Sequence, residues 1–332
     1  MKTKKEYIIV AIIIVALSLY LVYHRKDRTN YEMPEIPAVS AHSITRVEII
    51  KKDSSVTLVK SDNAWHISPD GFPVNTEKVM IMLNLVENFK LTVLISESNP
   101  ASESEKYSMY QLDNDNKITV KAWAEDKLKI DIDVGKAAAS YKHTFVKFAG
   151  DYRVYHAKND LRKGFDLSED TLLDKTVLSF NTNKVREIHF TEGGTAKVLA
   201  LKEIPKEIKE PKKTDKDGVA GQVEDPEDME TVWMGMENKK IEDPVVNEML
   251  ETLSGLKCEK YLKGKKEDYS DPIYKIFLKG EKEYFISVFE KTDKESKIYP
   301  AVSSRVDYPF ELKAELVEKI KKRSEKIFEV SG

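Results

Sequence analysis

The chain has 332 residues, enough for two domains that each bury a core of their own. Its 54 Lys and Arg nearly balance its 57 Asp and Glu, so the net charge is only −3 although 33% of the residues are charged. Such a surface has no global field that would attract nucleic acid, and the single cysteine, Cys258, can form neither an intrachain disulfide nor a thiolate metal site. We therefore expect no nucleic-acid partner.

The first predicted element is an apolar helix near the N-terminus, where Ser18 is the only plainly polar residue between Tyr7 and Tyr23. At ~1.5 Å per residue this stretch spans about 25 Å, slightly less than the ~30 Å hydrocarbon core, and flanking Tyr and basic side chains can extend it to both interfaces. The sequence therefore predicts one transmembrane helix within a membrane anchor at residues 1–28, formed by Tyr7, Ile8, Ile12, Val15, Leu19, Val22 and Tyr23.

A cleaved signal peptide is the alternative interpretation of this segment. Its apolar run ends in residues 20–25 without a small-residue cleavage pattern, which favours an uncleaved signal anchor. Basic residues are balanced on the two sides, so the positive-inside rule barely decides the orientation, and the N-terminal amine favours a cytoplasmic N-terminus. We expect a single-pass protein of the inner (cytoplasmic) membrane with extracytoplasmic, periplasmic domains.

Residues 29–42, with Pro34 and Pro37, are predicted to form an extended stalk. The first unit, residues 43–180, shows the apolar–polar alternation of strands on both sides of a helix that begins after Asn75, a good N-cap. Its strands are predicted at 44–51, 56–60, 63–68, 118–123, 128–134, 141–148 and 152–156, and a short closing helix within 161–175.

The second unit, residues 181–332, follows the same formula. Asp243 is the predicted N-cap of its helix, with Pro244 at the first helical position, and a basic amphipathic helix is predicted over 311–328. Its strands are predicted at 185–190, 196–201, 273–278, 284–289, 298–302 and near Val306.

The two units share one register. Trp65 and Trp233 are 168 residues apart (233 − 65), and the apolar helix positions that follow them are 167 apart (246 − 79). Such self-similarity at a fixed spacing indicates repeated architecture. The fold predicted is α+β, two tandem units of mostly antiparallel sheet with packed helices, and the repeat core anchors are Trp65, Val79, Leu83, Val86, Trp233, Val246, Leu250 and Leu253.

An insert separates the first hairpin of the second unit from Trp233. Glu48 and Glu187 occupy equivalent places in the two hairpins but are only 139 residues apart (187 − 48). Residues 203–229 supply the extra length and are rich in Lys, Glu, Asp and Pro. Because such a segment has little apolar surface to bury, the sequence predicts a charged, disordered or mobile loop.

Catalytic signatures are missing from the sequence. It has no Gly-rich phosphate loop and no Gly-x-Ser-x-Gly turn, and its six histidines lack the spacing of a helical metal site. Asp131 and Asp133 share one face of a strand, but that pattern favours a solvated outer face over acid–base chemistry, and Cys258 is interpreted as a small buried side chain. We expect a protein that is not an enzyme and has no cofactor or metal.

The tryptophans are the remaining candidates for a binding site. Aromatic rings can stack on sugars, but residues repeated at the same place in two units are better explained as core, as for Trp65 and Trp233. Trp123 has no aromatic counterpart in the second unit. It is the single weak ligand candidate.

Several motifs together resemble a known bacterial family. They are a Trp strand, a Pro-containing turn, a Val-x-x-Met-Leu helix, a Tyr-Ser turn and the runs Val134–Lys136, Tyr152–Tyr155 and Asp174–Leu178. This pattern, which covers nearly all of the chain after residue 43, resembles the domain of unknown function 4340. The chain departs from it in its charged insert and in the lack of a Gly after the Tyr of each Tyr-Ser turn.

The resemblance implies a membrane-anchored bacterial protein with tandem α+β domains. Members of that family are often encoded beside ABC-type transporters similar to those associated with gliding motility, which implies an accessory, binding or scaffolding role at the cell envelope with ABC transporter subunits as partners. This is association rather than mechanism. The alternative function is an extracytoplasmic glycan-binding module or a hydrolase of envelope polymers.

Overall fold

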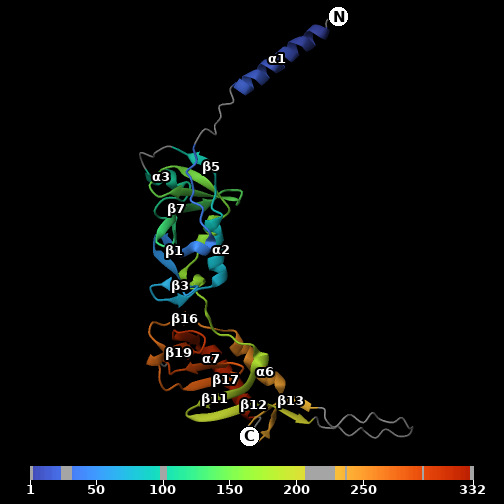
Figure 1. Ribbon diagram of the computed structural model, residues 1–332, viewed down its shortest axis with the longest axis vertical. Helices are drawn as coiled ribbons and strands as arrows, with labels where there is room; N and C mark the ends of the chain where they lie inside the picture. Colours follow the sequence, from blue (N-terminus) through green and yellow to red (C-terminus); the bar gives the residue numbers. More distant parts are fainter. Residues whose placement is uncertain are drawn as a thin grey trace, which may run out of the picture. The chain divides into compact units, whose positions relative to one another are not determined.

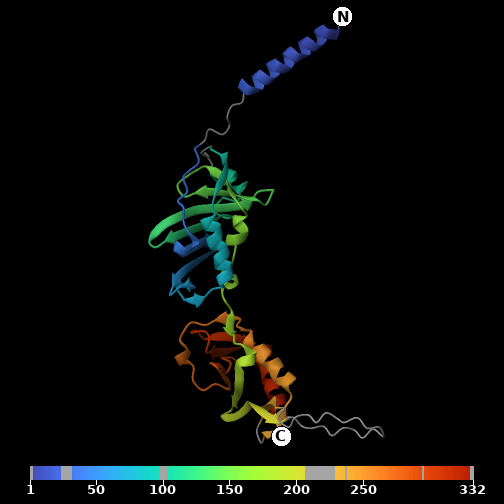
Figure 2. The same ribbon diagram turned by 45° about the vertical axis from the view of Figure 1, so that its right-hand side comes forward.

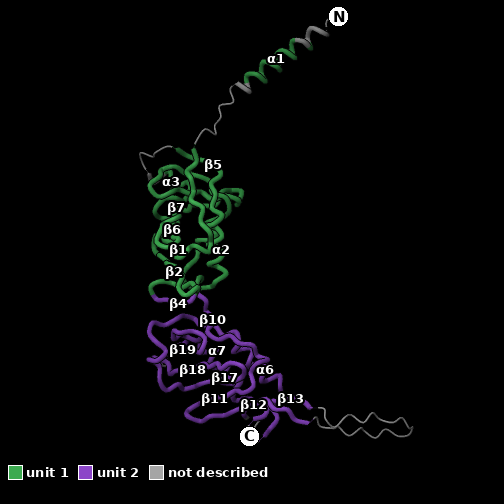
Figure 3. Tube along the Cα trace, viewed as in Figure 1, with its two compact units in different colours: residues 1–69, 74–172 green, residues 70–73, 173–332 purple. Residues whose placement is uncertain are grey.

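In the computed structural model, the described residues are 3–23, 32–97, 103–205, 229–235, 238–293 and 295–329. The chain begins with helix α1 (Thr3–Tyr23) and divides into two compact units (Figures 1 and 3). Unit 1 comprises residues 1–69 and 74–172, and unit 2 comprises residues 70–73 and 173–332. The predicted stalk is described only from residue 32 onward.

Unit 1 is built on an antiparallel sheet. Its neighbouring strands run in the order β3-β2-β1-β6-β7-β8-β9-β5. Buried and outward residues alternate along its strands, so that one face of the sheet packs on the core. In β6 the buried residues are Ile118, Val120, Ala122 and Ala124. The strands are β1 (Ile44–Lys51), β2 (Ser54–Ser61), β3 (Ala64–Ser68), β5 (Leu91–Ser96), β6 (Ile118–Ala124), β7 (Lys127–Ala137), β8 (His143–Phe148) and β9 (Val154–Lys158).

The main helix of unit 1 is α2 (Thr76–Glu87), which Figure 2 shows beside the strands. The Asn75 side chain accepts a hydrogen bond of 3.1 Å from the Lys78 amide, so the predicted N-cap is confirmed. One side of α2 is buried, with Met82 and Leu83 among the residues that face the core. The shorter helices are η1 (Ala41–Ser43), α3 (Glu103–Ser108), α4 (Leu161–Phe165) and α5 (Glu169–Leu172).

Unit 2 contains a nine-stranded antiparallel sheet in the order β14-β13-β12-β11-β17-β18-β19-β20-β16. Its strands are β11 (Val185–Glu192), β12 (Thr195–Pro205), β13 (Met229–Met234), β14 (Lys240–Ile241), β16 (Lys260–Tyr261), β17 (Tyr274–Gly280), β18 (Glu283–Val288), β19 (Ile298–Ser303) and β20 (Phe310–Lys313). A separate pair joins β10 (Thr176–Leu178) to β15 (Leu256–Lys257), and residues 70–73 contribute β4 (Phe72–Pro73).

Helices α6 (Asp243–Ser254) and α7 (Ala314–Glu329) pack against each other in unit 2 (Figure 2). Their apolar sides join the inward strand residues in one hydrophobic core, which includes Met249, Leu253, Val317 and Ile320. Short 3-10 turns lie at η2 (Thr182–Lys184) and η4 (Lys266–Asp268). Burial on this scale stabilises each large apolar side chain by about 1.5–3 kcal/mol.

The strand order is the same in the two units. The sequence β3-β2-β1-β6-β7-β8-β9-β5 of unit 1 has its counterpart in β13-β12-β11-β17-β18-β19-β20-β16 of unit 2, with α2 and α6 at the same point of the chain order. Two large antiparallel sheets with helices are therefore present, as predicted. Within the part of the chain that the structure describes, no helix combines the length and the apolar character needed to cross a membrane.

Several predicted boundaries are wrong. Asp243 is the first residue of α6 rather than its N-cap, which is Glu242, because the helix starts one residue earlier than the Pro rule indicated. The last helix begins at Ala314, since residues 310–313 pair with β19 as β20, and the strand predicted near Val306 is this β20. Leu312 fits a helical stripe and a strand equally well.

The predicted insert is shorter than expected at both ends. Residues 203–205 belong to β12 and Met229 begins β13, and these strands pair with each other over Ile204 and Glu230. Residues 206–228 lie outside the described part of the chain. Strand β5 was not predicted, because its run Leu91–Ile95 has no apolar–polar alternation and follows α2 directly.

Candidate interaction surface

The eight predicted core anchors are all buried. Trp65 is 9% exposed and Trp233 4% exposed, and the helix positions that follow them are buried more deeply still. These positions are Val79, Leu83 and Val86 on α2, and Val246, Leu250 and Leu253 on α6. Each set belongs to the packing of its own unit and leaves almost no surface for a ligand.

Trp123, the weak ligand candidate, lies half-buried on the outward side of β6, opposite Arg46 of β1. The Arg46 guanidinium carbon is 3.7 Å from the centroid of the indole ring, a cation–π contact. Such a contact stabilises an exposed pair by about 0.5–1 kcal/mol. One face of the ring is therefore covered by the neighbouring strand, which a stacked sugar would have to displace.

A buried carboxylate lies on the same sheet. Asp133 of β7 is only 6% exposed. It accepts hydrogen bonds from Thr119 Oγ1 at 2.6 Å and Lys117 Nζ at 3.1 Å, and Lys147 Nζ lies 3.4 Å away. The expected solvated face is thus wrong for Asp133, because long lysine side chains cover it, whereas Asp131 stays partly exposed. Because three side chains of its own unit already contact it, this carboxylate is not exposed for binding a ligand.

A second charged cluster fixes the start of β9. Arg153 Nε and Nη2 donate to the two carboxylate oxygens of Asp151 at 2.9–3.1 Å, and Tyr155 Oη donates to Asp151 Oδ2 at 3.0 Å. Burial alone would raise the pKa of Asp151, but these hydrogen bonds outweigh it and lower that pKa. Burial, and then the bond to Asp151, raise the pKa of Tyr155. The groups bind one another and serve to hold the turn.

Other reactive side chains are also held by packing. Cys258 is buried in unit 2, and burial raises the pKa of its thiol to about 12. His143 and His156 stack with ring centroids 5.6 Å apart, and burial, followed by the neighbouring His143, lowers the pKa of His156. Among the described residues, no three His, Cys, Asp or Glu side chains gather as a group that could hold a metal ion.

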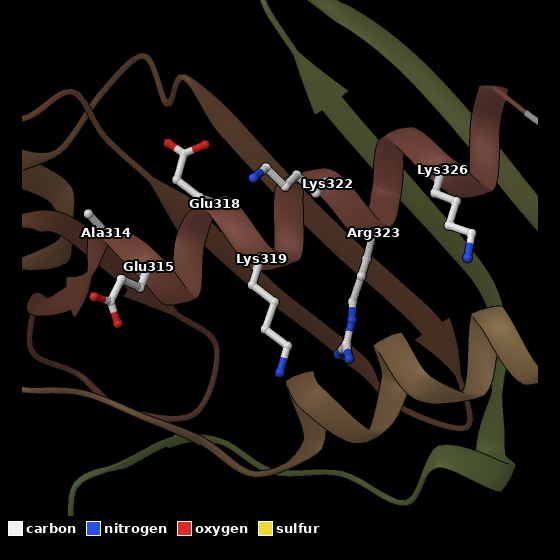
Figure 4. A pocket seen from close by; sticks show the side chains of 7 residues that line it. All are labelled: Ala314, Glu315, Glu318, Lys319, Lys322, Arg323 and Lys326. Atoms are coloured by element: carbon white, nitrogen blue, oxygen red, sulfur yellow. The ribbon is translucent and has the colours of Figure 1, made fainter.

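The outer side of α7 lines a shallow groove of about 680 Å³, seen in Figure 4. Arg323 points toward α6, where it donates to the Glu248 carboxylate and backbone and to Thr252 Oγ1. Lys319 and Lys322 are exposed on the same helix. Glu315 and Glu318 are exposed there as well, so the contact of Arg323 holds α7 against α6 and leaves an outer side of mixed charge.

Helix α2, which is the counterpart of α6 in unit 1, borders an open groove of about 480 Å³. Its floor is apolar, with Ile81 56% exposed and Leu85 half-buried on α2. Amide and basic side chains complete the lining, namely Asn84, Asn88, Lys90, Lys158 and Asn159. We call these seven residues the α2 groove. The sequence prediction missed it, although apolar residues outside the buried stripe of α2 were a signal for it.

These observations describe a chain with an apolar N-terminal helix and two α+β units of equal strand order. In unit 2 helix α7 packs against α6, whereas in unit 1 helix α2 borders an open groove. The chain belongs to the family described as Domain of unknown function (DUF4340), whose model matches residues 65–272. This match is one continuous stretch with parts of both units. No curated protein and no solved structure matches the chain.

Proposed function

We propose that this protein is a non-enzymatic component of the bacterial cell envelope, anchored in the inner membrane by α1, whose tandem units bind or scaffold the subunits of an ABC-type transport system. The observation that carries the proposal is the character of α1. Every side chain from Ile9 to Tyr20 is exposed, and all but Ser18 are apolar or aromatic. A helix that is apolar all round is stable only when another apolar phase covers it, and lipid is such a phase.

The equal strand order supports an origin of the two units by duplication, and their different helices support different roles for them. Partner binding is supported by the open α2 groove of unit 1. The transporter partner is an expectation from the resemblance described above, since members of that family are often encoded beside ABC-type transporters, whereas the family match itself names no partner. Family membership by itself assigns no activity.

Fractionation of cells tests the anchor. The full chain should sediment with membranes and remain there after a carbonate wash, whereas a chain without residues 1–28 should stay in the supernatant. A reporter that works only in the cytoplasm, fused after Gly332, should be silent if the units are extracytoplasmic. Sedimentation of the truncated chain with membranes, or an active reporter, would contradict these parts of the proposal.

Affinity purification from membranes in a mild detergent tests the transporter partner. The full chain should recover ABC transporter subunits in a fixed ratio. A control chain, in which an unrelated membrane helix replaces residues 1–28, should recover them equally well because the units carry the binding surface. Recovery of the protein alone from both preparations would overturn the proposed role.

A further inference from the structure

We infer that the α2 groove of unit 1 binds an amphipathic helix of a partner protein, and that the polar flank of this helix is acidic. The inference deepens the proposed binding role and rests on it. It follows from a comparison of α2 with α6, from the length of the helix that comes after the last strand in each unit, and from the charge beside the groove.

The 167-residue register relates each groove position on α2 to a position on α6. Ile81 corresponds to Glu248 and Leu85 to Thr252. In unit 2, Glu248 and Thr252 are the two residues that accept hydrogen bonds from Arg323 of α7. The side of α2 that carries Ile81 and Leu85 therefore corresponds to the side of α6 that contacts α7.

Among the described residues of unit 1, no long helix follows the last strand to fill this place. After its last strand, α4 (Leu161–Phe165) has five residues, whereas α7 after β20 has 16. Gly164 lets α4 approach one side of Leu85, since an added Cβ would collide with the Leu85 side chain. Ile81 nevertheless remains more than half exposed. At ~25 cal/mol per Å², covering such apolar surface would contribute favourably to binding.

The charge beside the groove specifies the partner's flank. Lys90 and Lys158 are neighbours, because the Lys158 amide donates to the Lys90 carbonyl at 2.8 Å. Neither lysine forms an ion pair with an acidic group among the described residues, and Asp160, close by in sequence, caps α4 through the Lys163 amide. Carboxylates on a bound helix would complement these two cations. The α7 of a second copy does not fit, because its apolar residues, such as Val317 and Ile320, are buried in its own core and its outward side carries acidic and basic residues in equal number.

Two synthetic amphipathic helices of 18 residues test the inference directly. They share one Leu-rich face, and their flanks carry Glu in one peptide and Lys in the other. By fluorescence anisotropy, the full chain in detergent should bind the Glu peptide at least about tenfold more tightly than the Lys peptide, a difference that should shrink at high salt. Equal binding of both peptides, or binding of neither, would overturn the inference.

Variants locate the binding to the groove. Ile81→Asp and the pair Lys90→Glu with Lys158→Glu should each weaken binding of the Glu peptide by about tenfold or more, a loss of about 1.4 kcal/mol. Met80→Asp is the matched control, because Met80 is an exposed apolar residue of the same helix that does not line the groove. Circular dichroism should show the same helical content in all of them. A loss of binding in Met80→Asp equal to that in Ile81→Asp would contradict the assignment.

Two further measurements separate this inference from the proposed function. If Ile81→Asp recovers transporter subunits as well as the unaltered chain does, the groove inference fails and the proposed function stands. If no transporter is recovered but the Glu peptide binds at the groove, the groove inference stands and the proposed partner fails. Concentration-dependent dimers that Ile81→Asp abolishes would replace the partner helix by a second copy and overturn the inference.

Discussion

Asp133 shows at the residue scale what one buried charge requires of its surroundings. Its carboxylate is hydrogen-bonded to Thr119 and Lys117 and lies close to Lys147. In Asp133→Ala the two partly covered lysines would lose their shared counter-charge and repel each other. We expect a loss of about 2–4 kcal/mol in the free energy of unfolding, measured by urea denaturation.

Asp131→Ala is the matched control for that prediction. Asp131 lies on the same strand two residues earlier, its ion pair with Lys121 is 3.5 Å long, and both side chains are partly exposed. Because exposed ion pairs stabilise proteins little, we expect a loss of no more than about 1 kcal/mol. Equal losses in the two variants would show that burial of the Asp133 carboxylate has no special weight.

Trp123 distinguishes the scaffold proposal from the glycan-binding alternative. Because Arg46 covers one face of its ring, we expect Trp123→Ala to leave any co-sedimentation with purified peptidoglycan unchanged and to lower stability by about 1–2 kcal/mol, from lost cation–π contact and lost packing. Co-sedimentation of the unaltered chain that disappears in Trp123→Ala would favour the alternative.

The buried thiol of Cys258 should make both its chemical modification and the stability of the fold depend on pH. Burial raises the pKa of the folded thiol to about 12, while an unfolded thiol titrates near 8.5, so its thiolate fraction at pH 8 is lower by on the order of 10³-fold. Modification by a thiol reagent at pH 8 should be at least about 100-fold slower in the folded chain than in urea. Since the folded pKa is raised, the stability that this group contributes is complete below pH ~8.5 and declines as the pH rises above it. Equal modification rates would refute the burial.

At the scale of elements, Gly280 at the end of β17 shows how closely this strand approaches the residue that precedes β11. An added Cβ there would collide with the backbone carbonyl of Lys184 beside β11, and a backbone cannot move aside as a side chain can. We expect Gly280→Ala to lower the free energy of unfolding by about 1–3 kcal/mol. Gly255→Ala, where an added Cβ meets nothing within 4 Å, should change it by less than about 0.5 kcal/mol in the same urea titration.

Strands in which apolar and polar residues largely alternate could be predicted from the sequence to the residue, as β1 shows at Ile44–Lys51. Strand β5 could not, because an apolar run such as Leu91–Ile95 gives no period that separates strand from helix. The start of α7 was misplaced for a related reason: Leu312 suits both structures, and only the long-range pairing of β20 with β19 decides between them. Local sequence patterns thus predict the bounds of an element where one face is buried. They fail where pairing with a distant strand decides between helix and strand.

The sequence could indicate only part of the candidate surface, for the same physical reason. Ile81 and Leu85 stand out as apolar residues on the outer side of a predicted helix, where the second unit has Glu248 and Thr252. That Lys158 lies beside them depends on the pairing of β5 with β9, which the missed strand concealed. The clustering of Lys117, Lys147 and Asp133 was likewise hidden, because alternation shows the face of a strand but not what covers it.

At the scale of the whole molecule, the two units do not follow the order of the chain. Residues 70–73 belong to unit 2, although they lie in sequence between β3 and α2 of unit 1. Phe72 is part of the hydrophobic core of unit 2, where its ring stacks on Tyr261 at 5.3 Å and meets Tyr308 edge-on at 5.1 Å. A substitution in the first half of the sequence should therefore weaken the second unit.

We expect Phe72→Ala to lower the stability of unit 2 by about 3 kcal/mol, because it removes a buried ring and both aromatic contacts. Hydrogen exchange should then accelerate in the strands of unit 2, such as β17 and β20, while β1 and β6 keep their protection. Phe89→Ala is the matched control, since Phe89 is a buried ring of unit 1 packed edge-on against Phe148, and it should produce the opposite pattern. Faster exchange in β1 rather than β17 in Phe72→Ala would show that residues 70–73 stabilise unit 1 instead.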